Sequence, residues 1–418
     1  MSIESKILKI LNDAKDASRV VAGVSTENKN KALSQMAKAL LKNYRYILLQ
    51  NAKDVVIAKK KGLSDAMIDR LRLTNKRIKD MAQAIKSVHG LKDPVGEVLR
   101  KWKRPNGLLI KKVRVPIGVV GIVYESRPNV TSDCAALCIK SGNACVLRGG
   151  SEAINSNLAI HRSITSGIEK FGIPREAIGM INVTDRAAVE AMLHADEYID
   201  LIIPRGGESL IKHVAKNSRV PVVKHYKGVC HLYVDRSADL KKAKEIVLNA
   251  KVQRPGVCNA IENLLVHKDV ARKFLPEAAR ALEEADVELR GCEKTRKILR
   301  GIRAATDKDW YEEYLDLTLA IKIVNNVEEA IAFINKYGSS HSDAIVTKNK
   351  KAVDKFLNNV DSACVYLNAS TRFTDGHQFG MGAEIGISTD KIHARGPMAL
   401  EELCTYKYII LGSGQIRQ

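Results

Sequence analysis

The sequence predicts an α/β protein with two doubly wound units, and three observations lead to this expectation. Apolar, β-branched segments alternate with helical patterns from about residue 119 onward. Segments such as Leu201-Ile202-Ile203 are apolar throughout, as expected for parallel strands that helices cover on both faces. The alternation starts again near Val229, which indicates a second unit of the same kind.

Individual elements can be expected from the pattern of apolar residues. Residues 1 to about 90 are expected to be helical, and Ser25-Thr26 and Ser64-Asp65 can cap two of the helices. An apolar run over 113–123 predicts a strand. In the first unit, helices are expected over 131–141, 155–170, 187–195 and 209–216. Strands are expected over 144–147, 178–183 and 199–203. In the second unit, helices are expected over 239–252, over 269–285 and after residue 326. Strands are expected over 232–234, 260–267, 319–324, 344–346 and 364–367.

The C-terminal residues 405–411 form a β-rich stretch with little to pack on in their own unit. A strand with a free edge can pair with another subunit, so we expect a homo-oligomer.

The composition indicates a cytoplasmic protein. No apolar run reaches the roughly 18 residues that span a bilayer, and no signal peptide is found, so no membrane partner is expected. The eight cysteines form no C-x-x-C pair, so free thiols are expected and no metal site.

The net charge of +21 is spread along the chain, and only 5% of residues are aromatic, so specific nucleic-acid binding is not expected. The charge indicates either lysine-rich solvated faces or a positive field that attracts small anions.

Two glycine pairs are candidates for a phosphate-binding edge. Gly149-Gly150 and Gly206-Gly207 each follow an expected strand and precede an expected helix, whose N-terminus favours anions. The fingerprint G-x-G-x-x-G is absent, and taken alone such a pair is more often only a tight turn.

Cys258 is the best-placed nucleophile among the cysteines. Pro255-Gly256 ends the preceding helical pattern, Arg254 brings positive charge, and Asn259 follows the sulfur. A reactive thiolate needs such a turn-like, electropositive setting. Cys134, Cys138, Cys145 and Cys364 lie in helix or strand patterns that indicate packing.

Five motifs resemble the gamma-glutamyl phosphate reductase family, a branch of the aldehyde dehydrogenase superfamily. They are residues 115–121 (Val-Pro-Ile-Gly-Val-Val-Gly), 253–260 (Gln-Arg-Pro-Gly-Val-Cys-Asn-Ala), 368–376, 382–389 and 393–397. The resemblance covers essentially the whole chain and implies the aldehyde dehydrogenase-like fold. The implied parts are an NADPH-binding domain (1–107 and 123–228), a catalytic domain (229–362), and a substrate loop with a small β oligomerisation arm (108–122 and 363–418).

The resemblance implies NADPH-dependent reduction of L-glutamyl 5-phosphate to L-glutamate 5-semialdehyde through a thioester on Cys258, the second step of proline biosynthesis. The main-chain N–H of Cys258 is one implied oxyanion donor, and a side chain within 124–129, with Asn129 as the candidate, is the other. Other aldehyde dehydrogenases carry a general-base glutamate where this chain has residues 224–228, which contain none. His225 is either a substitute base or, more simply, a structural histidine.

The resemblance also implies binding residues. Arg148 and Ser151, with the two glycine pairs, are implied for NADPH or NADP⁺, and Ser151 suits a 2′-phosphate better than an acid would. Glu313 is implied for the nicotinamide ribose, or is a solvated acid. The implied substrate-binding residues are Arg127, Ser370, Arg372 and Asp375. Glutamate 5-kinase is an expected transient partner, because an acyl phosphate is labile.

Two other functions remain open from the sequence. The first is a different acyl-reducing or aldehyde-oxidising dehydrogenase of the superfamily. The second is a non-catalytic binding protein, which the presence of Cys258 disfavours.

Overall fold

The structure, a computed structural model, describes residues 3–417, and the chain folds into two compact units. Unit 1 comprises Met1–Lys224, Met381–Gly386 and Met398–Gln418, and unit 2 comprises His225–Gly380 and Ile387–Pro397. Each unit has its own parallel sheet with helices packed on it, so the predicted α/β class with two doubly wound units is confirmed.

These units differ from the three parts expected above. Residues 119–122 lie in the parallel sheet of unit 1, and residues 363–380 belong to unit 2. Residues 1, 2 and 418, at the ends of the expected parts, lie outside the described residues.

The sheet of unit 1 has four parallel strands in the order β5-β4-β3-β6. They are β3 (Val119–Tyr124), β4 (Ala144–Gly149), β5 (Ile178–Met180) and β6 (Leu201–Arg205). All residues of β3, β4 and β5 are buried, which explains their apolar composition. The chain winds from β3 to β4 and β5 on one side and then to β6 on the other, so the carboxyl ends of β3, β4 and β6 meet where the winding reverses.

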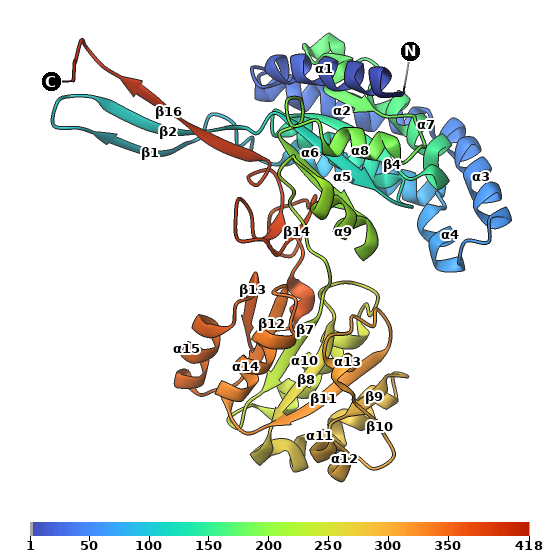
Figure 1. The fold of residues 1–418 in the computed structure, drawn as a ribbon, viewed down its shortest axis with the longest axis vertical. Coiled ribbons are helices and arrows are strands. Elements are labelled where there is room, and N and C mark those ends of the chain that lie inside the picture. The colour runs from blue at the N-terminus through green and yellow to red at the C-terminus, as the bar shows by residue number, and fades with distance from the viewer. Residues whose placement is uncertain (1–2, 418) are drawn as a thin grey trace. The chain divides into compact units, whose positions relative to one another are not determined.

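Nine α-helices accompany this sheet within the described part of unit 1 (Figure 1). They are α1 (Ile3–Val21), α2 (Thr26–Lys42), α3 (Tyr44–Lys60), α4 (Asp65–Leu71), α5 (Asn75–Gly90), α6 (Asn129–Lys140), α7 (Ile154–Ile164), α8 (Ala187–Leu193) and α9 (Glu208–Asn217). Both predicted caps are confirmed, because Ser25 and Ser64 accept from the main-chain N–H groups of Asn28 and Met67. The helix expected over 155–170 ends at Ile164, shortly before Gly167 takes a left-handed φ of +81°.

Three antiparallel strands form an extended arm on unit 1 (Figure 1). They are β1 (Val98–Lys103), β2 (Leu109–Pro116) and β16 (Cys404–Leu411), with β2 in the centre. The strand expected at 405–411 is confirmed, but the first segment of the arm, expected at 108–122, is instead a hairpin over 98–116. The charged, exposed β1 gave no apolar signal.

Gly118 divides the apolar run over 113–123 into β2 and β3. It has a φ of +133°, and a Cβ there would lie 2.2 Å from Oδ2 of Asp200. That carboxylate accepts from the main-chain N–H of Val119 and from Lys15, so the chain must turn at this position.

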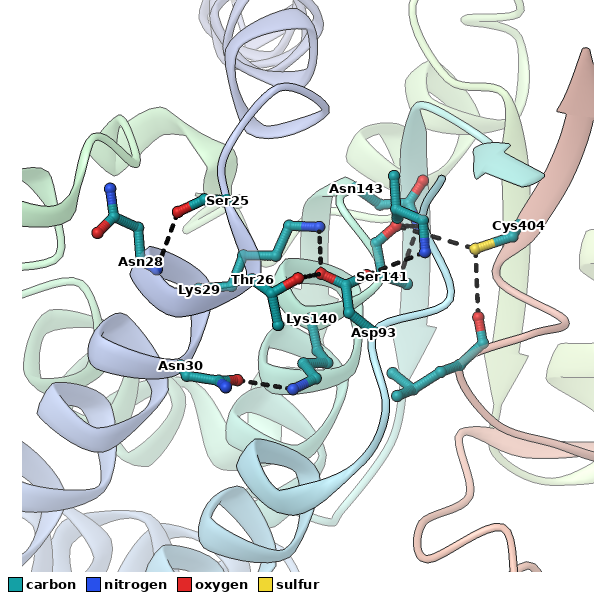
Figure 2. Close-up of polar contacts among 12 residues, drawn as sticks. Ser25, Thr26, Asn28, Lys29, Asn30, Asp93, Lys140, Ser141, Asn143 and Cys404 are labelled. Carbon is teal, nitrogen blue, oxygen red and sulfur yellow. Dashed lines mark hydrogen bonds and ion pairs between the residues drawn. The ribbon is translucent and has the colours of Figure 1, made fainter. Parts of the chain in front are cut away.

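A buried polar cluster lies at the root of the arm (Figure 2). Lys29, with 1% of its side chain exposed, pairs with Asp93 at 3.0 Å, and Lys140 donates to Asn30 at 2.6 Å. Next to it, the Asn143 amide donates to the carbonyl of Leu403, immediately before β16. The cluster therefore joins helices α2 and α6 to the base of the arm.

The sheet of unit 2 has seven parallel strands in the order β10-β9-β11-β8-β7-β12-β13. They are β7 (Cys230–Val234), β8 (Ile261–His267), β9 (Glu288–Gly291), β10 (Arg303–Ala304), β11 (Thr318–Val324), β12 (Ser342–Val346) and β13 (Cys364–Leu367). The helices are α10 (Leu240–Val252), α11 (Lys268–Glu283), α12 (Glu293–Ile298), α13 (Asp307–Trp310), α14 (Val327–Tyr337) and α15 (Lys350–Asn359). One hydrophobic core lies under α10 and α11, and another lies under α14 and α15.

A separate pair of short strands, β14 (Gly386–Ser388) and β15 (Gly396–Met398), completes the fold. Among residues 3–417, none of the helices has the length and apolar character that crossing a membrane requires.

Replacing Asp93 by Asn should lower the free energy of unfolding by about 3 kcal/mol, because Lys29 would stay buried without a counter-charge. Chemical denaturation monitored by circular dichroism would measure this loss. As a control, Asp80→Asn breaks the exposed pair with Lys76 and should cost no more than about 0.5 kcal/mol. Equal losses in the two variants would contradict a special role for the buried pair.

Candidate active site

Cys258 lies in the turn between α10 and β8, and its side chain is partly exposed. Six of the eight free cysteines are buried, including the four that the sequence assigned to packing. The turn-like, accessible setting predicted for Cys258 is therefore what the structure has.

Cys292 is the other partly exposed cysteine, and the sequence analysis did not single it out. Burial opposes ionisation of this thiol, but hydrogen bonding with Thr295 and main-chain groups lowers its pKa below the usual value. Cys292 follows β9, whereas Cys258 precedes β8, and all strands of this sheet are parallel. Cys292 therefore lies at the carboxyl ends of the strands, and Cys258 lies at their amino ends.

The loop after β13 holds the Cys258 turn through Asn259. The Asn259 side-chain amide donates to the carbonyl of Thr374 at 2.7 Å, and the Thr371 hydroxyl donates to the carbonyl of Asn259 at 2.6 Å. On the other side, the buried Cys230 thiol donates to the carbonyl of Cys258 at 3.1 Å. Hydrogen bonds thus fix the carbonyls of Cys258 and Asn259 and the side chain of Asn259.

A buried ion pair joins the two elements that flank the turn. Lys251, near the end of α10, contacts Glu262 of β8 at 2.5 Å, and neither side chain is exposed. Burial raises the pKa of Glu262 and lowers the pKa of Lys251, and the contact between the two groups opposes both shifts and favours the charged pair.

Glu313 contacts the segment that packs on the turn. Its carboxylate accepts the main-chain N–H of Gly228 at 2.9 Å. A Cβ on Gly228 would lie 1.9 Å from the carbonyl oxygen of Cys258, so only glycine allows this approach. Glu313, expected at the nicotinamide ribose, is therefore linked to the Cys258 turn through Gly228.

The three substrate candidates of unit 2 lie in the loop that holds the turn. The Ser370 hydroxyl accepts the main-chain N–H of Arg372, and Nε of Arg372 donates to Gln253 at 2.9 Å. Asp375 accepts the main-chain N–H groups of His377 and Gln378 and thereby shapes its own turn.

The two histidines near this loop have structural contacts. His225 hydrogen-bonds through Nδ1 to the carbonyl of Ile387 and contacts the ring of His341 edge-to-face. Burial, with a smaller effect from His225, lowers the pKa of His341 to about 3.

The two glycine pairs of unit 1 lie at the carboxyl ends of β4 and β6, as predicted. A Cβ on Gly150 would lie 2.2 Å from the carboxylate of Glu152, and one on Gly206 would lie 2.3 Å from Glu125. Both carboxylates are used locally, because Glu152 accepts from Ser126 and Glu125 accepts from the N–H of Gly207. The two carboxylates crowd these glycines, so a phosphate site at the carboxyl ends of β4 and β6 stays a prediction.

Arg148 and Ser151 flank the first glycine pair differently. Arg148 is buried, its Nη2 donates to the carbonyl of Thr184 at 3.0 Å, and its Nε has no partner among the described residues. Ser151 is exposed at the start of a 3₁₀ turn that leads into α7. Ser151 is therefore the accessible member of this pair.

Asn129 and Arg127 follow β3. The Asn129 amide donates one hydrogen to Asp133 at 2.8 Å, and Arg127 is exposed. Burial raises the pKa of Asp133 to about 6. An asparagine amide has two hydrogens, so Asn129 retains a second donor.

Known proteins resemble this chain over its whole length. The aldehyde dehydrogenase family model matches residues 2–296. Over 100% of both chains, the sequence is 56% identical to a gamma-glutamyl phosphate reductase of Caldanaerobacter subterraneus subsp. tengcongensis and 55% identical to one of Geotalea daltonii. The crystal structure of gamma-glutamyl phosphate reductase from Thermotoga maritima matches with a TM-score of 0.97 and 50% identity, covering 99% of this chain and 100% of that one.

An engineered glycolyl-CoA reductase with bound NADP⁺ shares the fold at 14% identity, with a TM-score of 0.68 over 97% of this chain and 96% of that one. The chain therefore belongs to the aldehyde dehydrogenase family, whose members are oxidoreductases. Within that family it belongs to the gamma-glutamyl phosphate reductase branch, as the five motifs predicted.

The variant Lys251→Met should lose about 3–5 kcal/mol of stability in denaturant unfolding, because Glu262 would remain buried and unpaired. The double variant Lys251→Met/Glu262→Gln removes both charges and should recover most of that loss. As a control, Lys297→Met removes the partner of exposed Glu293 and should leave stability nearly unchanged. A double variant as unstable as the single one would show that the charge is not the cause.

Proposed function

We propose that this protein reduces L-glutamyl 5-phosphate to L-glutamate 5-semialdehyde and releases phosphate, the second step of proline biosynthesis from glutamate. The observation that carries the proposal is the accessible Cys258 thiol, held in a turn by the same loop that presents Arg372. The activity named for relatives more than 50% identical over the full chain supports it.

The proposed reaction passes through a thioester on Cys258. The thiolate attacks the acyl carbon, a C–S bond forms, and the C–O bond to phosphate breaks with its electron pair on the phosphate. NADPH supplies the hydride that reduces the thioester. The resulting hemithioacetal collapses to the aldehyde and restores the thiolate. The main-chain N–H of Cys258 and the amide of Asn129 are the proposed donors to the oxyanion.

The segment before β7 supports reduction rather than hydrolysis. Residues 224–228 contain no glutamate, and Gly228 packs directly on the main chain of Cys258. Without a carboxylate base in this segment to activate water, the thioester persists until hydride arrives.

We propose NADPH as the cofactor, held at the carboxyl ends of β4 and β6 by the two glycine pairs, with its 2′-phosphate near Arg148 and Ser151. Glu313 is proposed for the nicotinamide ribose. Arg127, Ser370, Arg372 and Asp375 are proposed for the substrate.

A homo-oligomer formed through the arm is proposed, because Tyr406, Tyr408 and Ile410 of β16 are exposed apolar side chains. Light scattering that finds only monomers would contradict it. We also propose a cytoplasmic location and transient transfer of the acyl phosphate from glutamate 5-kinase. Equal coupled flux with the two enzymes mixed or kept apart would contradict the transfer.

Changing Ser151 to Asp should lower the preference for NADPH over NADH by about tenfold, because a carboxylate repels a 2′-phosphate and can accept from a free 2′-hydroxyl. The ratio of kcat/KM values for the two cofactors measures this preference. An unchanged ratio would place the 2′-phosphate elsewhere.

Changing Cys258 to Ser should reduce the reverse reaction of glutamate semialdehyde, phosphate and NADP⁺ by at least about 10³-fold, because a hydroxyl is a far weaker nucleophile. Cys292→Ser is the matched control and should keep wild-type activity, since that thiol lies at the opposite ends of the parallel strands. Full activity of the Cys258 variant would reject the mechanism. Efficient phosphate-independent oxidation of simple aldehydes with NAD⁺ would instead favour a general aldehyde dehydrogenase.

A further inference from the structure

Two arginines, Arg254 and Arg372, lie on segments next to Cys258 in unit 2. Of the two, only Arg372 is expected from the sequence to bind the substrate. Arg254 precedes Cys258 in the same turn and is exposed. Arg372 comes from the loop after β13, and its Nε donates to Gln253, the residue next to Arg254. The same loop holds Asn259 through Thr371 and Thr374, so both ends of the turn are fixed to it. The Cys258 turn with Arg254 and the loop with Arg372 therefore form one hydrogen-bonded assembly.

The positive charge of this assembly is not neutralised locally. Within residues 3–417, neither arginine forms an ion pair with a carboxylate. Burial lowers the pKa of Arg372, the charge of Arg254 lowers it further, and Cys258 and Asp375 oppose these effects. Asp375 also accepts two main-chain N–H groups of its own turn. Two like charges kept together beside a nucleophile indicate a site for an anion with more than one negative charge.

We propose that Arg254 and Arg372 together bind the phosphate group that Cys258 displaces, so that Arg254 is a substrate-binding residue in addition to those predicted from the sequence. This inference rests on the proposed function. A phosphate group carries nearly two negative charges at neutral pH and accepts from two guanidinium forks, whereas one fork suffices for a carboxylate.

The position of the pair also favours phosphate over the α-carboxylate. The leaving phosphate is bonded through oxygen to the carbon that Cys258 attacks, whereas the α-carboxylate lies at the far end of the carbon chain. Arg254 shares a turn with Cys258, and this closeness to the sulfur favours the nearer group. When the C–O bond breaks, its electron pair remains on the phosphate, and the two guanidinium groups stabilise the added charge.

Alkylation of Cys258 tests the site independently of reductase activity. Wild type, Arg254→Gln and Arg372→Gln are treated with anionic iodoacetate and neutral iodoacetamide, and the rate of Cys258 labelling is followed by peptide mass spectrometry. The control Arg272→Gln removes an exposed arginine of α11. Each site variant should lower the iodoacetate-to-iodoacetamide rate ratio by about three- to tenfold, and the control should not change it. Circular dichroism checks that each variant is folded.

Inorganic phosphate and glutamate then identify the anion. Phosphate should slow labelling of wild type and the control, and its half-protecting concentration should rise at least about tenfold in Arg254→Gln. In the reverse reaction, the same variant should raise the KM for phosphate and leave that for NADP⁺ unchanged. Unchanged phosphate protection in Arg254→Gln would overturn the proposal, and so would protection of wild type by glutamate but not by phosphate. If protection behaves as expected but wild type does not reduce glutamyl phosphate, the phosphate site stands and only the proposed function fails.

Discussion

The hydrogen bonds of Asn259 are the constraint on which the candidate site depends. Residues 253–260 and 370–375 are far apart in the chain, and Asn259 joins them by donating to Thr374 and accepting from Thr371. Since the amide nitrogen is fixed on the carbonyl of Thr374, Oδ1 must point away, and it is buried without a partner among the described residues. An unpaired buried acceptor is costly, so this geometry indicates that precise placement of Cys258 outweighs a loss of stability.

The buried pair of Lys251 and Glu262 joins the two elements that flank the same turn. The end of α10 and the start of β8 flank the nucleophile and must stay together. A wholly buried ion pair resists their separation, because breaking it leaves a charge buried without a partner. Gly228, whose N–H donates to Glu313, packs directly on the main chain of Cys258.

Much of the fold could be predicted because buried parallel strands and capped helices leave strong local signals. The runs at β4, β6 and β8 and the serine caps of α2 and α4 are examples. The exposed strand β1 and the short α12 and α13 bury too little apolar surface to leave such a pattern. The division of the run over 113–123 depends on Asp200, which lies far along the chain, so no local reading could place it.

The site was predictable to a similar extent. The motifs made Cys258, the glycine pairs and the loop of Arg372 candidates, because these residue types serve chemistry directly. Other contacts join residue types that leave no signal in the sequence. They are the Lys251–Glu262 pair and the hydrogen bonds from Asn129 to Asp133 and from Ser126 to Glu152. Only the folded chain brings them together.

The most direct measurement of the central claim is the mass of the enzyme in the reverse reaction without phosphate. Glutamate semialdehyde and NADP⁺ should then form the thioester, which persists because no phosphate is present to release the acyl group and residues 224–228 provide no carboxylate base for hydrolysis. After an acid quench, mass spectrometry should find a glutamyl group on the peptide that contains Cys258, together with a single-turnover burst of NADPH. Steady phosphate-independent turnover, or a glutamyl group on any other residue, would contradict the account.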